Sequence, residues 1–232
     1  MRGGLLPPGA YAEECFGDLT PGAVLPEELA AVRTATVARR REFHTVRTLA
    51  RRALAGLVPE AAGQYDTHAL LPDAKGAPSW PLGIVGSMTH NRGYHAAVVA
   101  KSSAYAAIGL DAELSRVLPP EVCDLISRPE ELPMLEALSR RDPSVPWSCL
   151  LFSAKESVYK AWHPLTGAWL DFHDVSVQIE HPAGTFRARL PTHVGAGGAR
   201  TIEELEGRWV YRADLVLTAA YLPSGATTDS PG

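Results

Sequence analysis

The segment 147–163 is predicted to form a long helix that carries charged residues. Its apolar residues recur at the spacing of one helix face: Leu151, Ala154, Val158 and Ala161. Glu156 and Lys160 fall together on nearly the opposite side, and Pro164 is expected to end the helix. A Glu–Lys pair four residues apart is usually an exposed salt bridge, worth about 0.2–0.5 kcal/mol. The segment therefore predicts a helix with a buried stripe and a charged face, whose role depends on the charges that meet it.

A second group of acids lies upstream, in residues 105–113, which are predicted to form a β-strand. Asp111 and Glu113 project from the same face of this strand, because alternate residues do so. Neighbouring carboxylates repel unless a cation or a proton lies between them, and Mg²⁺ accepts carboxylate and phosphate oxygens as ligands. Glu156 would complete such a site. The alternative is that the two acids face solvent at the end of a strand.

Residues 37–58 are predicted to form another long helix, with arginines along one border of its apolar face. Arg47 and Arg51 each lie within about 20° of Arg40 at 100° per residue. Arginine suits phosphate because its planar guanidinium donates two hydrogen bonds at once. The alternative is a solvated arginine face, which is what most charged runs form.

A loop rich in glycine and proline, 73–78, precedes a predicted hairpin of strands 84–90 and 94–101. Lys75 in this loop is either a contact to a phosphate or a base, or a plain turn residue. Three polar residues stand at the end of the first strand: Ser87, Thr89 and His90. A lone histidine is more often a hydrogen-bonded core residue than a ligand-binding one.

The remaining elements follow from the same patterns of periodicity, proline and glycine. In order, they are an irregular lead-in at 1–26 with a short helical turn around 11–16, a helix from Pro26, two short helices within 119–140, hairpins of 175–179 with 186–190 and of 209–212 with 215–221, and a disordered tail after Pro223.

The composition is that of a globular protein of one or two domains. The chain has 232 residues, of which 46% are hydrophobic and 21% charged, with a net charge of −4. No apolar run is long enough for a membrane span, and the N-terminus lacks the apolar region of a signal peptide. Three separated cysteines without a CxxC motif predict neither disulfides nor zinc, so a reducing cytoplasm is the expected compartment.

Four motifs, in order, resemble those of the 4′-phosphopantetheinyl transferases. The signature pair is GLDAE at 109–113 and FSAKESVYK at 152–160; WPLGIVGSMTH at 80–90 and RREF at 40–43, followed by Arg47 and Arg51, fit the same family. The resemblance extends from about residue 27 to residue 221. It is nearest to the surfactin-type and enterobactin-type group of actinobacteria, which modify carrier proteins of polyketide and nonribosomal peptide synthases.

This resemblance implies an α+β fold, a pseudodimer of two similar halves with the active site in the cleft between them. The expected domains are 1–104, which would bind the 3′-phosphate and adenine of coenzyme A, and 105–232, which would hold the metal and the catalytic residues. Each half would run through a helix and end in a hairpin, although no strong sequence repeat accompanies this pattern. Because one chain holds both halves, a monomer would suffice.

The resemblance also implies an activity: transfer of the 4′-phosphopantetheine arm of coenzyme A to a serine of an apo acyl, peptidyl or aryl carrier protein. Mg²⁺, or Mn²⁺, would bind to Asp111, Glu113 and Glu156, and Glu156 or another group would accept the serine proton. Lys160 would stabilise the leaving diphosphate. The implied coenzyme contacts are Arg39, Arg40, Arg47, Lys75, Ser87, Thr89, His90 and Lys155, and the sequence does not distinguish among the arginines at 39–41.

Two other classes of function are compatible with parts of the sequence. A non-catalytic module that binds coenzyme A or carrier proteins would be indicated by the loss of one of the acids or of Lys160, and all of them are present. A nucleic-acid binder built on the arginines of 39–52 would favour a basic domain, whereas this chain is net acidic. Neither nucleic acid nor a membrane is therefore expected as a partner.

Overall fold

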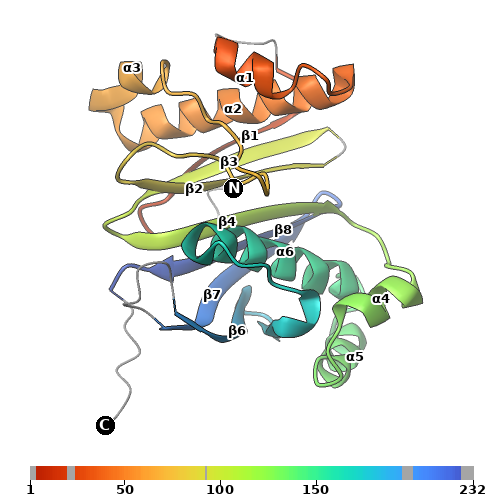
Figure 1. Cartoon of the computed structure of the whole chain (residues 1–232). Helices are drawn as coiled ribbons and strands as arrows, with labels where there is room; N and C mark the ends of the chain where they lie inside the picture. The colour runs from red at the N-terminus through yellow and green to blue at the C-terminus, as the bar shows by residue number, and fades with distance from the viewer. Residues whose placement is uncertain (1–3, 20–23, 92, 195–200, 226–232) are drawn as a thin grey trace.

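Two antiparallel sheets form the centre of the molecule (Figure 1). This computed structural model describes residues 4–19, 24–91, 93–194 and 201–225. The smaller sheet has the order β1-β3-β2, and the larger has the order β4-β8-β7-β6-β5. The strands are β1 Tyr11–Phe16, β2 Ile84–Asn91, β3 Tyr94–Lys101, β4 Tyr105–Leu114, β5 Ser176–Glu180, β6 Thr185–Val194, β7 Thr201–Arg212 and β8 Leu215–Pro223.

Each sheet carries a long helix on its outer face, so the molecule is built in four layers (Figure 1). α2 (Val37–Leu57) covers the smaller sheet, and α6 (Trp147–Thr166) covers β4 and β8 of the larger. The shorter helices are α1 Pro26–Ala31, α3 Ala62–Tyr65, α4 Pro120–Ile126 and α5 Leu132–Arg141, with 3₁₀ turns at Pro59–Ala61 and Phe172–Asp174. In the described part of the chain, no helix combines the length and apolarity that a membrane-spanning helix needs.

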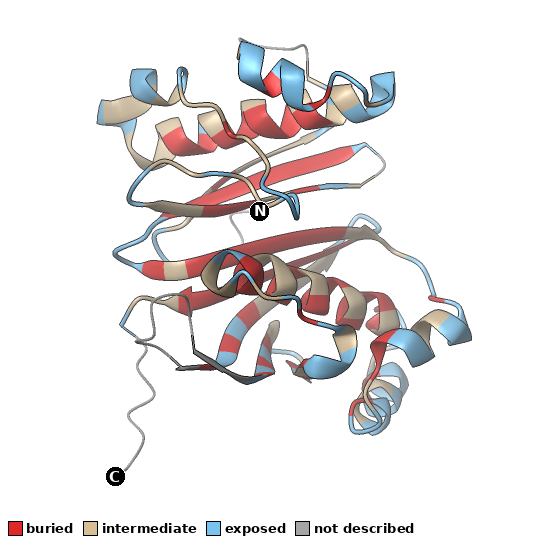
Figure 2. Cartoon of the chain, viewed as in Figure 1, coloured by how far each residue is buried: buried red, intermediate tan, exposed pale blue. Residues whose placement is uncertain are grey.

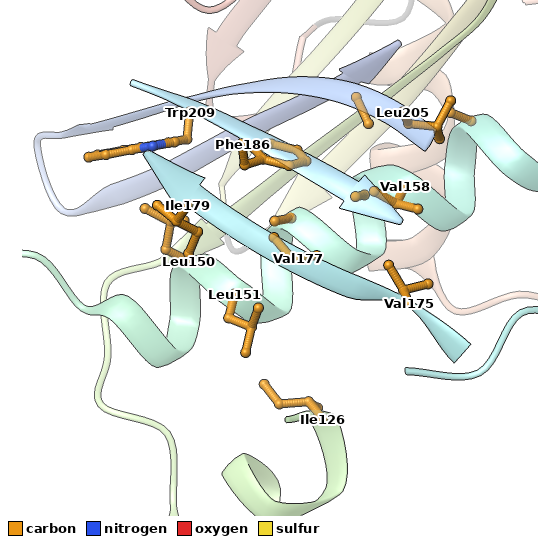
Figure 3. Packing of buried hydrophobic residues seen from close by; sticks show 14 of the residues in the cluster. Ile126, Leu150, Leu151, Val158, Val175, Val177, Ile179, Phe186, Leu205 and Trp209 are labelled. Carbon is orange, nitrogen blue, oxygen red and sulfur yellow. The ribbon is translucent and has the colours of Figure 1, made fainter. Parts of the chain in front are cut away.

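Layers of buried side chains between the sheets and beneath the helices hold these elements together (Figure 2). Between the sheets, residues of β3 such as Val98 pack with residues of β4 and β8 such as Leu110 and Leu217. Behind the larger sheet, α6 packs against β5, β6 and β7 around Phe186 and Trp209 (Figure 3). Burial of such apolar surface is the main contribution to the stability of a domain of this size.

Polar contacts also join the two sheets at their edges. Both carboxylate oxygens of Glu14 on β1 accept from the guanidinium of Arg212 on β7, at 2.9 and 2.7 Å. The Tyr94 hydroxyl donates to the same carboxylate at 2.6 Å. Although burial opposes it, these partners help to lower the pKa of Glu14 to about 2. Glu14 therefore stays ionised, which keeps this link between the sheets intact at neutral pH.

The predicted α+β fold of two halves, each a helix on an antiparallel sheet, is confirmed. The expected boundary between residues 104 and 105 lies in the turn between β3 and β4, and this division stays a prediction. The predicted helical turn at 11–16 is wrong, because this segment pairs with β3 as an edge strand. The prediction that Pro164 ends the helix over 147–163 is also wrong, because α6 continues to Thr166 and is capped by Gly167, whose positive φ of 68° suits a residue without a side chain. The predicted disordered tail lies mostly outside the described residues.

Gly109 on β4 allows α6 to lie directly against the strand. A Cβ atom at this position would be 1.9 Å from the carbonyl oxygen of Ser157. We therefore expect Gly109→Ala to lower the free energy of unfolding by about 3 kcal/mol, because helix or strand must shift. Gly63→Ala in α3 is the matched control, since a Cβ there meets nothing within 4 Å.

Urea denaturation of both variants measures the difference. An alanine at position 109 that is tolerated as well as the one at position 63 would contradict the close packing of α6 on β4.

Candidate functional site

The acids predicted from the sequence share one electrostatic environment where α6 crosses β4. Asp111 is only 4% exposed, whereas Glu113 and Glu156 are partly buried. Burial and then the negative charge of Asp111 raise the pKa of both glutamates, and the positive charge of Lys160 opposes this in each. Two strand residues and two helix residues thus act on one another across the contact between α6 and β4.

Asp111 is fixed by hydrogen bonds from α6. The Lys160 ammonium donates to its Oδ1 at 2.6 Å and to the carbonyl oxygen of Leu110 at 3.2 Å. The buried Ser153 hydroxyl donates to its Oδ2 at 2.8 Å. Thr218 of β8 holds this serine in turn, since its hydroxyl donates to the Ser153 carbonyl at 2.8 Å. The orientation of the Asp111 carboxylate is therefore set by the packing of the helix on the sheet.

Glu113 is held from the other half of the molecule. The side-chain amide of Asn91, at the end of β2, donates to Glu113 Oε2 at 2.8 Å and to the Ala112 carbonyl at 3.2 Å. The sequence singled out the turn after β2 but not Asn91 itself. In the sequence, only the position of Asn91 next to His90 drew attention to it. The structure was needed to identify this contact between the halves.

The three acids do not lie close enough together, as they stand, to hold a metal ion. Among the described residues, no three His, Cys, Asp or Glu side chains lie close enough together to hold an ion. Three carboxylates are opposed by Lys160 and by the exposed Arg116, which lies 3.9 Å from Glu113, so an excess of negative charge remains in a partly buried place. Burial first, and then the charge of Asp111, raise the pKa values of Glu113 and Glu156, and a bound cation would relieve both effects. The donor set thus fits a hard divalent ion, and metal binding stays a prediction.

A cleft beside these acids is lined by both halves of the chain. Residues from the 75–78 loop and from β2 form one side, and residues from α6 form the other. Four of the predicted site residues line it: Lys75, Ser87, Glu156 and Lys160. Tyr159 and His163 also line it, on the same face of α6 as Glu156. Their spacing of three and four residues along that face could have identified them.

Two contacts fasten the loop that carries Lys75 to the C-terminal half. His163 Nε2 lies 3.2 Å from Asp73 Oδ2 at the start of this loop. The Lys75 ammonium lies 5.3 Å from the centre of the Trp169 ring, within the range of a cation–π contact. Asp73 also accepts from the Lys75 and Ala77 amides at 2.8 and 2.9 Å, which closes the turn. The loop is therefore a fixed wall of the cleft.

The predicted phosphate-binding residues of α2 and β2 have different environments. The exposed Arg39 guanidinium contacts Nε2 of His90, and Glu42 Oε2 lies 3.6 Å from the same nitrogen. Arg47 is buried instead: its Nε donates to the Leu70 carbonyl at 3.1 Å. Burial lowers the pKa of Arg47 to about 10, so it still carries its charge at neutral pH. Arg40 is partly buried, and Thr89 is buried in β2.

Lys155 departs most from its predicted role. Its ammonium does not join Lys160 and Asp111 but is buried against Glu131, with an Nζ to Oε2 distance of 2.7 Å. Burial lowers the pKa of Lys155, and Glu131 opposes that shift. The prediction that Lys155 contacts coenzyme A is untested, but the structure does not bring its charge to the cleft. Glu131, 24 residues away, carried no signal in the sequence.

A second, mostly apolar pocket adjoins the cleft. It has a volume of about 380 Å³, which is within the range of small-molecule sites. It is lined by Leu125, Lys155, Glu156, Tyr159, Trp169, Leu170, Asp171, Phe172 and Val175. Glu156 and Tyr159 line both this pocket and the cleft. A ligand that filled both would therefore pass directly over Glu156.

Comparison with known proteins places both halves of the chain in one family. Residues 27–100 match the 4′-phosphopantetheinyl transferase N-terminal domain, and residues 107–217 match the 4′-phosphopantetheinyl transferase superfamily. The chain is 44% identical to the 4′-phosphopantetheinyl transferase Svp of Streptomyces mobaraensis, over 99% of this chain and 93% of the relative. It is 40% identical to PptT of Mycobacterium tuberculosis, over 92% of each chain. It is 37% identical to Npt of Nocardia iowensis, over 93% and 96%.

His90 provides a test of the site's electrostatics. Burial, and then the positive charge of Arg39, lower the pKa of His90 to about 4. We expect Arg39→Gln to raise this pKa, while burial keeps it below 6.5. Arg40→Gln, which removes the neighbouring charge, should leave it nearly unchanged. NMR titration of the histidine ring signals measures both values, and equal shifts in the two variants would contradict the Arg39–His90 contact.

The same shift has a consequence for stability. Because the pKa of His90 is lower in the folded chain than its ordinary 6.5, the unfolded chain binds this proton more readily. The contribution of His90 to the free energy of unfolding therefore falls as the pH decreases from 6.5 to 4, and this loss should be smaller in Arg39→Gln.

Proposed function

The chain belongs to the 4′-phosphopantetheinyl transferase superfamily and is an enzyme of that type, and we propose how its cleft performs the transfer. The substrates are coenzyme A and an apo carrier protein, and the products are the holo carrier and 3′,5′-adenosine bisphosphate. The observation that carries this proposal is the hydrogen-bonded Asp111–Lys160 pair beside Glu156, at the edge of a cleft that both halves line. Acyl, peptidyl and aryl carrier proteins are the expected acceptors.

The polar side of the cleft suits the nucleotide. Lys75 and Ser87 line it, and Lys160 extends from the opposite side. Arg39, which contacts His90 and pairs with Glu42, has 48% of its side chain exposed, so a phosphate can reach it from solvent. The charge of the buried Arg47 interacts with that of Arg39. We assign the 3′-phosphate to Arg39 and His90, with Arg47 as a buried support, and the diphosphate to Lys75 and Lys160.

The apolar pocket suits the pantetheine arm. Its walls include Leu125, Trp169 and Phe172, which offer carbon surface to an extended chain. Because the pocket and the cleft share Glu156 and Tyr159, a coenzyme that fills both would place its diphosphate beside the acids. That is where the phosphorus–oxygen bond must break.

Asp111, Glu113 and Glu156 would hold Mg²⁺ or Mn²⁺, which when bound neutralises charge on the diphosphate oxygens. The residues of the chain perform the other tasks. Glu156 accepts the proton of the carrier serine while the serine oxygen attacks the β-phosphorus. Lys160 stabilises the charge that develops on the departing α-phosphate. The bond between the β-phosphorus and the bridging oxygen breaks, and 3′,5′-adenosine bisphosphate leaves.

Both halves of a single chain contribute to this arrangement, which favours a monomer as the active unit. The described cysteines, Cys15, Cys123 and Cys149, are all free thiols. Free thiols favour a reducing compartment, and we therefore propose the cytoplasm as the site of action.

Removal of the acids tests the catalytic assignment. We expect Asp111→Asn and Glu156→Gln each to lower the transfer rate by about 100-fold or more, because the site loses charge that it uses in the transition state. Glu136→Gln, on the exposed face of α5, is the control and should keep the normal rate. The measurement is the mass gain of an apo carrier protein incubated with enzyme, coenzyme A and Mg²⁺.

Mg²⁺ titration calorimetry on the same proteins gives a readout independent of turnover. An Asp111→Asn variant that binds Mg²⁺ and transfers the arm at the normal rate would remove these acids from the mechanism.

The arginine assignment is tested separately. We expect Arg39→Gln to weaken the binding of coenzyme A by about 10-fold or more, and to affect 3′-dephospho-coenzyme A little, because one charge-assisted hydrogen bond is lost. Arg52→Gln, at an exposed position of the same helix, is the matched control. Calorimetry with both ligands measures this difference, and equal losses for the two ligands would detach Arg39 from the 3′-phosphate.

A further inference from the structure

Lys155 is adjacent to Glu156 in sequence but serves a different part of the molecule. Lys155 is 2% exposed, and its ammonium donates to three acceptors. It donates to Glu131 Oε2 at 2.7 Å, to the Ile126 carbonyl at 2.8 Å and to the Phe172 carbonyl at 2.9 Å. An ammonium has three N–H groups, so its hydrogen-bonding capacity is fully used.

Glu131 is equally well satisfied. Besides the lysine, its Oε2 accepts from the Arg128 amide at 2.8 Å, and its Oε1 accepts from the Val177 amide at 2.6 Å. Both side chains of the ion pair are 1% exposed. For Lys155 to reach a phosphate, it would have to leave the Glu131 carboxylate buried without its counter-charge, which is strongly unfavourable.

The acceptors of Lys155 lie in the walls of the apolar pocket. Ile126 ends α4 next to Leu125, which lines one wall. Phe172 lines the same pocket together with Leu170 and Val175. These two segments are more than 40 residues apart in the chain, and α6 lies between them in sequence. The lysine thus ties both walls to the helix that carries Glu156.

We propose that Lys155 and Glu131 are positioning residues for the coenzyme's pantetheine arm. By holding the end of α4 and the 170–175 segment at a fixed separation on α6, they set the width of the apolar pocket. Lys155 touches no phosphate and acts through the pocket walls. This inference rests on the proposed function, which places the arm in that pocket.

The test compares two ligands that differ only in the arm. Coenzyme A carries the arm, whereas 3′-phospho-ADP keeps the diphosphate and the 3′-phosphate without it. The variant is Lys155→Met with Glu131→Gln, which removes both charges together and so leaves neither one unpaired in the interior. Calorimetry gives the affinity of each ligand for the wild-type protein and the variant, and thermal unfolding reports on the fold.

We expect the double variant to bind coenzyme A at least about tenfold more weakly and 3′-phospho-ADP within about twofold of the wild type, because only the walls around the arm change. Equal losses for both ligands would make Lys155 a phosphate contact and overturn the inference, and so would no loss for either. A wild-type protein that binds coenzyme A no better than 3′-phospho-ADP would instead contradict the placement of the arm in the proposed function.

A measurement on the wild-type protein covers the case in which the double variant does not fold. In a crystal structure with coenzyme A bound, Lys155 Nζ should remain within hydrogen-bonding distance of Glu131 and of the Ile126 and Phe172 carbonyls. A structure in which this ammonium contacts a phosphate oxygen would overturn the inference.

Discussion

The contact between α6 and β4 is the constraint on which the candidate site depends. Gly109 has no side chain, so the helix backbone at Ser157 lies where any other residue would place its Cβ. At this distance Ser153 and Lys160 of the helix reach both oxygens of Asp111 on the strand. A wider gap would break these two hydrogen bonds first. The geometry of the acids is therefore a result of backbone packing rather than of any single charged pair.

Charge is divided unequally across the cleft that this contact helps to form. On the C-terminal side, Lys160 and the exposed Arg116 face three carboxylates, and burial makes the excess negative charge costly. On the N-terminal side, Lys75, Arg39 and Arg47 supply positive charge. A polyphosphate ligand can meet the positive side directly, whereas it needs a cation to approach the negative side. The proposed function uses this division, because the phosphates of the coenzyme would meet the positive side and a divalent ion would meet the negative side.

Much of this arrangement could be predicted from local spacing. Alternation along a strand placed Asp111 beside Glu113, and the four-residue spacing on a helix placed Glu156 beside Lys160. The long helices were predictable for the same reason, since their periodicity is local, whereas the fold class followed from the family resemblance. The family motifs then indicated that the two groups of charges meet, which spacing alone could not do.

What the sequence could not predict are contacts between segments that are distant in the chain. Tyr11–Phe16 is short and only weakly patterned, and it becomes a strand because β3 offers it an edge. The resemblance implies that Lys155 contacts coenzyme A, whereas the structure pairs it with Glu131, and nothing in the sequence links those two positions. Asn91 and His163 likewise gain their roles from partners in the other half, Glu113 and Asp73.

These last two contacts determine how the halves act together. One joins the end of β2 to β4, and the other joins the 73–78 loop to α6, so each crosses from one sheet system to the other. The cleft lies between the two contacts, and its walls keep their separation only while the sheets keep theirs. The geometry of the cleft therefore depends on the apolar layer between the sheets and on the Glu14–Arg212 ion pair beside it. Substitutions in that layer would act on coenzyme binding by moving one wall against the other, although they lie outside the cleft itself.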